Sequence, residues 1–212
     1  MVNTLSAIVI VTALLNPSVT HHGGDVISES TYSLSNRYED PFVNEVFSDN
    51  ILLTLAYLNG SVKKGDDIEW NEVRSPQETT FTLEPGHTFA FHDTVLDKYK
   101  DSITLTTNAH FISSEGFRSS GWLVGDGVCH LASFMYVVAK EAGLQVEAPT
   151  GHDFAAIPDI LKKDGVSIYY SPNNATTSQL QNLYITNNQE KPVVLVFAHD
   201  AGSLDIQVRQ LN

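Results

Sequence analysis

The sequence has one cysteine, Cys129, among 212 residues. A disulfide within the chain is therefore excluded, and the fold depends on its apolar core. In an exported protein, a lone cysteine is either buried and inert or kept for chemistry. The surroundings of Cys129 are consequently the first place to look for a site.

Basic residues are also scarce, since 12 Lys and Arg stand against 25 Asp and Glu, for a formal net charge of −13 at pH 7. Binding to nucleic acid requires cations that displace the counterions condensed on phosphates. The chain has no cluster of Lys and Arg, so we expect no nucleic-acid partner. The same charge repels anionic membrane surfaces and anionic wall polymers, unless a bound divalent metal bridges the two.

The apolar run Leu5–Leu15 has eleven residues, too few to cross about 30 Å of hydrocarbon at about 1.5 Å per residue. Its length is typical of the apolar region of a signal peptide, although Met1–Thr4 has no Lys or Arg. We predict that residues 1–20 are a signal peptide or an apolar anchor and that the protein is extracytoplasmic. A buried first strand or helix is the alternative.

The rest of the chain has the composition of a folded domain, with 42% hydrophobic and 17% charged residues. Its length suits one domain with a sizeable core. Polar residues from His21 to Asp40 predict a loose connector, which leaves residues 41–212 as the domain.

Apolar spacing over Pro41–Leu58 predicts an amphipathic helix that ends at Asn59-Gly60. A second helix is predicted from about Cys129 to Ala142. This order of helices and strands indicates an α+β fold, a single mixed domain with two main helices and a largely antiparallel C-terminal sheet. Strands are predicted over 61–73, 79–83, 87–91, 166–170, 183–186, 193–197 and 203–208, and residues 97–120 are expected to be irregular.

The segment Gly125–Gly143, GDGVCHLASFMYVVAKEAG, resembles the signature of the VanW family, in which a glycine-rich turn precedes a cysteine and a helix. Leu83–Phe91 is similar to the family's PGE-x-FSF segment. Tyr170–Thr176 is similar to its Y-x-P-x-x-DAT turn, and Asn182–Asn187 to its DL-x-F-x-N strand. The four segments occur in the family's order and cover most of the chain.

The chain departs from the family pattern at three places: His130 stands where the family usually has Gln, Ala132-Ser133 stands at the family's next polar pair, and Asn174 stands where the family has Asp. The resemblance implies a cell-envelope protein related to an accessory product of glycopeptide-resistance clusters. It supplies a location and a context rather than a reaction. Cell-wall peptide or glycan is the expected partner, and a membrane is contacted only through the N-terminal segment.

A cysteine in the first turn of a helix lies where the backbone N–H groups and the helix dipole favour a thiolate. A nucleophile also needs a base, for which His152 is the candidate, and Asn174 could orient that imidazole. One hypothesis is therefore a thiol amidase or peptidase that acts on cell-wall peptide. Substrate contacts are expected from Gly125, Asp126, Gly127, His130 and Thr176.

Two other interpretations of these residues stay open. Asp126 would raise the pKa of a nearby thiol, and free cysteines are often merely packed, so the rival hypothesis is a non-catalytic envelope module that binds peptidoglycan or scaffolds a partner. A zinc site could combine Cys129, His130 and His152 with His92 or His110, but no pair has ligand spacing. We expect no cofactor and no metal.

Overall fold

The computed structural model describes residues 23–121, 123–200 and 202–212. Its strands are β1 (Asp25–Ser33), β2 (Gln77–Leu83), β3 (Thr88–Ala90), β4 (Ile103–Thr106), β5 (Gln145–Glu147), β6 (Tyr184–Thr186), β7 (Val193–His199) and β8 (Ser203–Gln210). Its helices are α1 (Pro41–Leu58), α2 (Trp70–Val73), α3 (Val128–Glu141) and α4 (Ala175–Leu180), with short 3₁₀ turns at 97–99, 113–115 and 162–164.

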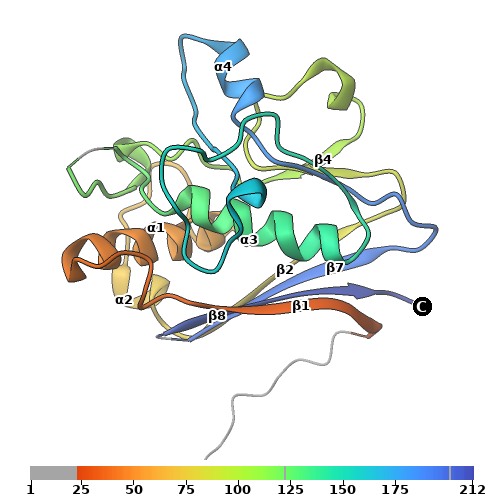
Figure 1. The fold of residues 1–212 in the computed structure, drawn as a ribbon, viewed down its shortest axis with the longest axis horizontal. Helices are drawn as coiled ribbons and strands as arrows, with labels where there is room; N and C mark the ends of the chain where they lie inside the picture. Colours follow the sequence, from red (N-terminus) through yellow and green to blue (C-terminus); the bar gives the residue numbers. More distant parts are fainter. Residues whose placement is uncertain (1–22, 122, 201) are drawn as a thin grey trace, which may run out of the picture.

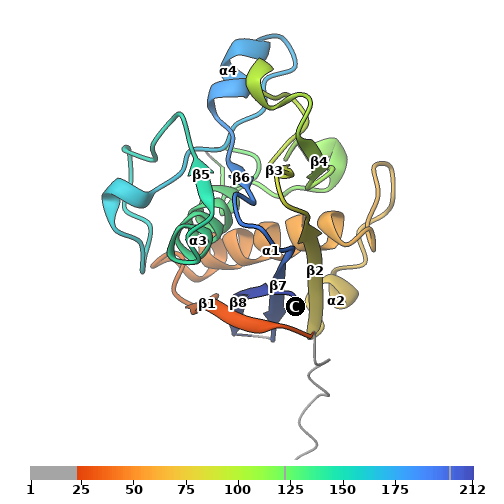
Figure 2. The ribbon, with the colours of Figure 1, turned by 90° about the vertical axis from the view of Figure 1, so that its right-hand side faces the viewer.

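Within these residues, two sheets flank a central pair of helices. The strand orders are β1-β8-β7-β2 in the first sheet and β4-β3-β6-β5 in the second. Helices α1 and α3 lie on one face of the first sheet, and the second sheet and α4 lie beyond the helices (Figures 1 and 2). The predicted α+β class with two main helices is confirmed.

The first sheet is antiparallel throughout, with β8 between β1 and β7, and β2 on the far side of β7. In the second sheet, β6 pairs antiparallel with both β3 and β5, whereas β3 and β4 run parallel. The prediction of a largely antiparallel C-terminal sheet is confirmed, and β7 and β8 form its centre.

The connector predicted for residues 21–40 is wrong over β1, which pairs along its length with β8. Ser28, Ser30 and Tyr32 alternate along one face of this strand. Tyr32 is buried and stacks on Phe134 of α3. Serines occupy the other two positions, so the side chains lack the apolar alternation that predicts a strand. The backbone hydrogen bonds to β8 stabilise β1 instead.

Helix α1 has the predicted bounds. The Asp40 carboxylate accepts hydrogen bonds from the N–H groups of Phe42 and Val43, and Pro41 occupies the first helical position. Asn59 follows the last turn, and Gly60 has φ +77°. The second half of α1 is buried on all sides, which an amphipathic pattern does not anticipate, because the helix lies between the two sheets.

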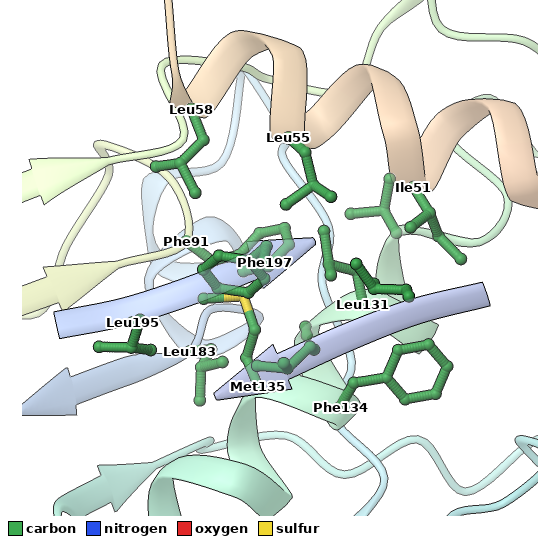
Figure 3. Packing of buried hydrophobic residues seen from close by; sticks show 14 of the residues in the cluster. Ile51, Leu55, Leu58, Phe91, Leu131, Phe134, Met135, Leu183, Leu195 and Phe197 are labelled. Carbon is green, nitrogen blue, oxygen red and sulfur yellow. The ribbon is translucent and has the colours of Figure 1, made fainter. Parts of the chain in front are cut away.

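The core forms where the two helices meet the first sheet. Figure 3 shows Ile51 and Leu55 of α1 above a cluster of side chains from α3 and from the sheet. All are almost fully buried: Ile51, Leu55, Leu131, Phe134, Met135, Leu195 and Phe197. At about 25 cal/mol per Å² of apolar surface removed from water, this layer is the main source of stability.

Two predicted strands are wrong. Residues 61–73 contain turns and the short helix α2. Residues 166–170 make a single bridge, between Val166 and Gly151. The backbone N–H groups of Val166, Ile168 and Tyr169 donate instead to Ser133 Oγ, Cys129 Sγ and the Gln181 carbonyl. These backbone groups of an apolar segment therefore have hydrogen-bond partners without a neighbouring strand.

Residues 97–120, expected to be irregular, include the short strand β4. The apolar run Leu5–Leu15 lies outside the described residues. Among the helices of the described part, none combines the length and the apolar character needed to cross a membrane.

Candidate functional site

The N-terminus of α3 is fixed against α1 by a glycine. Gly127 caps α3 with φ +98°, and a Cβ at this position would lie 2.4 Å from the carbonyl oxygen of Phe47. No larger residue fits, because backbone of α1 occupies the space. Gly127 is therefore required for packing the two helices.

The neighbouring residues of the turn are held from several sides. The Asp126 carboxylate accepts hydrogen bonds from the Ser120 N–H at 3.0 Å and from its hydroxyl at 2.7 Å. The buried Asn50 amide of α1 donates to the carbonyls of Asp126 and Arg118, and its oxygen accepts from the Arg118 N–H. The loop before α3 is thus fixed independently of any ligand.

The sulfur of Cys129 contacts the backbone of Ile168 in both directions. The Ile168 N–H donates to Sγ at 3.4 Å, and the thiol donates to the Ile168 carbonyl at 3.6 Å. In the described residues, no hydrogen bond joins Sγ to an imidazole or a carboxylate. The thiol is therefore used to hold the segment around residue 168 on α3.

Burial raises the pKa of the Cys129 thiol to about 11, and the nearby Asp126 carboxylate acts in the same direction. The hydrogen bond from Ile168 opposes this shift without reversing it. The prediction that the helix N-terminus lowers the thiol pKa is wrong here, because loss of solvent outweighs the helix dipole. At neutral pH the group is a thiol.

His152 lies on the loop that follows β5. Its ring Nδ1 is 3.0 Å from the Ala155 carbonyl oxygen, and its backbone N–H donates to Gly165. Burial lowers the pKa of His152, so the ring is neutral at pH 7. The group that orients this imidazole is a backbone carbonyl of its own loop, where Asn174 was expected.

His130 is buried next to α1, with its ring centroid 4.9 Å from that of Phe47 and 6.4 Å from that of His152. Burial lowers the pKa of His130 to about 3, with a further contribution from the Arg37 guanidinium. Its Nδ1 has no hydrogen-bond partner. A buried imidazole without a partner is uncommon and calls for an explanation.

These groups line one cavity of about 130 Å³. Six of the predicted site residues share it: Gly125, Asp126, Gly127, Cys129, His130 and His152. The cavity is bordered by exposed apolar and aromatic side chains, of which Phe154 is 72% exposed and Leu123 54% exposed. The structure thus brings most of the predicted site together.

A second cavity of about 320 Å³ adjoins the first. The two share five lining residues: Leu123, Val124, Gly125, Ile168 and Tyr169. The second cavity extends to His110 and Tyr170, whose rings stack at 3.8 Å. The two hollows form one groove that crosses the loop before α3.

Asn174 and Thr176 lie apart from this groove and line neither cavity. Asn174 is exposed and caps α4, where its side-chain oxygen accepts a hydrogen bond from the Thr177 N–H at 3.0 Å. Thr176 is exposed in the first turn of that helix. Asn174 therefore has a structural role as the cap of α4, and neither residue belongs to the groove.

In the described part of the chain, no group of three or more His, Cys, Asp or Glu side chains could hold a metal ion. His92 is buried and hydrogen-bonded to the Gln181 carbonyl. His110 pairs with Asp93 at 3.0 Å. Both are held by partners other than Cys129.

Sequence reasoning missed several residues of the site. Arg37, Phe47 and Ile168 line the first cavity with Cys129, although they are up to 131 positions apart in the chain. Arg37 is fully buried and forms an ion pair with Asp159. The sequence around a buried arginine does not differ from that around an exposed one, so no local pattern predicts that Arg37 is buried at this site.

A family model described as "VanW like protein" matches residues 72–209. The matched range contains α3 with Cys129, as well as His152 and Ile168, whereas Arg37 and Phe47 precede it. No curated protein and no solved structure matches the chain.

Proposed function

The chain belongs to the VanW-like family, and we propose that it is a non-catalytic binding module of the cell envelope whose ligand is peptidoglycan. The observation that carries the proposal is the engagement of Cys129 Sγ by the Ile168 backbone. A thiol used in this way, with its pKa raised to about 11, is a poor nucleophile at neutral pH.

The border of the groove supports binding. Exposed apolar side chains normally occur singly on a soluble protein, and their concentration around a hollow is typical of an interaction site. Leu123, Val124, Phe154 and Tyr169 are all exposed and all line the first cavity. Aromatic rings of this kind stack on sugar rings and on peptide side chains.

The rival proposal is a thiol amidase. Its support is that Cys129 and His152 line the same cavity, and that Cys129 follows the glycine cap of α3. Against it, the sulfur is engaged by the Ile168 backbone, and in the described residues no hydrogen bond joins it to the His152 ring. A catalytic base requires a hydrogen bond to the nucleophile or a path to one.

The test is co-sedimentation of the full chain with purified insoluble peptidoglycan. We expect wild type to pellet with the wall material and Leu123→Ala to bind roughly tenfold more weakly, a loss of about 1.4 kcal/mol. Leu161→Ala is the matched control, because Leu161 is 65% exposed against 54% for Leu123 and lines neither cavity.

The same samples separate the two proposals. The binding module releases no soluble fragments from the wall material, and Cys129→Ala still binds it. Release of peptide or sugar fragments by wild type but not by Cys129→Ala would replace the binding proposal with the hydrolase. If Leu123→Ala and Leu161→Ala bind the wall material equally well, the groove is not the binding site in either proposal.

A further inference from the structure

The ring of His152 is fixed in one tautomer by its neighbour. A carbonyl oxygen only accepts hydrogen bonds, so the contact of 3.0 Å with Ala155 requires that Nδ1 carries the proton. In the neutral ring, Nε2 is then a bare acceptor. Among the described residues, no donor is hydrogen-bonded to this Nε2, although the His152 side chain is buried and lines the first cavity.

His130 gives an independent sign of a missing partner. It is 4% exposed, lines the same cavity, and has an unpaired Nδ1. A neutral imidazole offers one donor and one acceptor. An unpaired buried polar atom costs about 1–3 kcal/mol, and the ring of His130, unlike that of His199 on β7, borders a cavity from which a ligand group could supply a partner.

The charges around the cavity exclude an anionic ligand. The Arg37 guanidinium is paired with Asp159, which leaves only its unpaired Nε as a further donor. Asp126 contributes a carboxylate to the wall, and both imidazoles are neutral at pH 7. No uncompensated cation therefore faces an incoming carboxylate or phosphate in the described part of this cavity.

We propose that the first cavity receives an uncharged amide of a peptide, whose N–H donates to His152 Nε2 and whose carbonyl accepts from His130. A peptide amide presents one donor and one acceptor in a single planar unit. It could therefore supply a donor to His152 Nε2 and an acceptor for a ring N–H of His130. The inference rests on the proposed function and narrows its ligand to the peptide part of the wall polymer. The adjoining cavity of about 320 Å³ accommodates the continuing chain.

The first test compares three probes with the full chain by NMR, and observes the ring nitrogens of His130 and His152. N-acetylalanine amide and N-acetylalanine have nearly the same size, but the second is a carboxylate at pH 7. We expect the amide to shift the His152 Nε2 resonance and to bind at least about tenfold more tightly than the carboxylate. Equal or tighter binding of the carboxylate overturns the inference.

N-acetylglucosamine is the third probe, because its hydroxyl groups could also donate to His152. A shift of the ring nitrogens by the sugar that exceeds the shift by the amide would overturn the peptide assignment. If the chain sediments with peptidoglycan but shows no preference for the amide, the inference fails and the binding function stands. If no probe and no wall material binds, both fail.

Variants separate recognition from folding. His130→Phe removes both ring nitrogens and should weaken binding of the amide probe about tenfold, whereas His130→Gln keeps a donor and an acceptor and should restore most of it. His199→Phe is the matched control, because His199 is 5% exposed, has both ring nitrogens unpaired and lies on β7, outside the cavity. If His130→Phe binds as His199→Phe does, His130 does not contact the ligand.

Discussion

Cys129 and Ile168 are joined in both directions, since the Ile168 N–H donates to Sγ and the thiol donates to the Ile168 carbonyl. The sulfur takes the place that a neighbouring strand would occupy beside residue 168. This contact fixes one wall of the groove to the first turn of α3. It links the lone cysteine to the shape of the site rather than to a reaction.

The first prediction concerns the reactivity of this thiol. Because burial raises the pKa of Cys129 to about 11, alkylation by iodoacetamide should be slow from pH 7 to 9. It should become fast only in denaturant, where the pKa of the thiol returns to about 8.5. The rate in folded His152→Ala should equal that of wild type. A thiolate that titrates below pH 8 in wild type, and not in His152→Ala, would establish an activated Cys–His pair.

The second prediction tests the close approach of α3 to α1. Gly127→Ala should lower the free energy of unfolding by about 3 kcal/mol, because its Cβ meets backbone of Phe47 at 2.4 Å and adds the strain of a positive φ. Gly121→Ala is the control, since Gly121 has φ +111° with nothing within 4 Å, and should cost about 1 kcal/mol. Equal losses in urea denaturation would contradict the packing role.

The third prediction concerns a buried carboxylate below the loop that precedes α3. Asp49 accepts two hydrogen bonds of 2.7 Å from Arg74 and also pairs with Arg118. Asp49→Ala leaves both guanidinium groups without this partner and should cost about 3–5 kcal/mol. Glu45→Ala is the matched control, because Glu45 contacts the same two arginines from the surface and should cost less than about 1 kcal/mol.

Thermal unfolding monitored by circular dichroism distinguishes these variants. If Asp49→Ala unfolds at the same temperature as Glu45→Ala, the buried pair contributes no more than the surface one. A loss confined to Asp49→Ala, accompanied by weaker peptidoglycan binding, would show that this network also supports the groove through Arg118.

The fourth prediction is a pH dependence of stability. The pKa of His130 is lowered to about 3 in the folded protein, whereas an unfolded histidine titrates near 6.5. Between these values the unfolded state binds a proton that the folded state does not, so stability falls as the pH drops below about 6.5. The contribution of His130 reaches at most about 1.4 kcal/mol per pH unit.

His130→Phe should therefore lose stability less steeply than wild type between pH 6.5 and 4, as measured by urea unfolding at each pH. At pH 7 the variant should be as stable as wild type or more stable, because it removes an unpaired buried nitrogen. An unchanged slope would mean that His130 is solvated or paired in solution.

Parts of the fold were predictable because their signals are local. Asp40 and Pro41 start α1, and Asn59-Gly60 end it, through hydrogen bonds and dihedral angles within a few residues. The turn before Cys129 and the apolar run of β7 are equally local. The predicted helix bounds and the strands predicted over 183–186, 193–197 and 203–208 were accordingly confirmed.

By itself, the sequence determined the family, the two main helices and the segment that contains the site. Only the tertiary structure decided which groups meet there. Residues 25–33 form a strand because β8 supplies the hydrogen-bond partners of their backbone. Ile168 is not in a strand, because Cys129 Sγ accepts the hydrogen bond of its backbone N–H. Burial then raised the thiol pKa against the helix dipole. Partners distant in the chain and loss of solvent set these outcomes, and neither is encoded in local spacing.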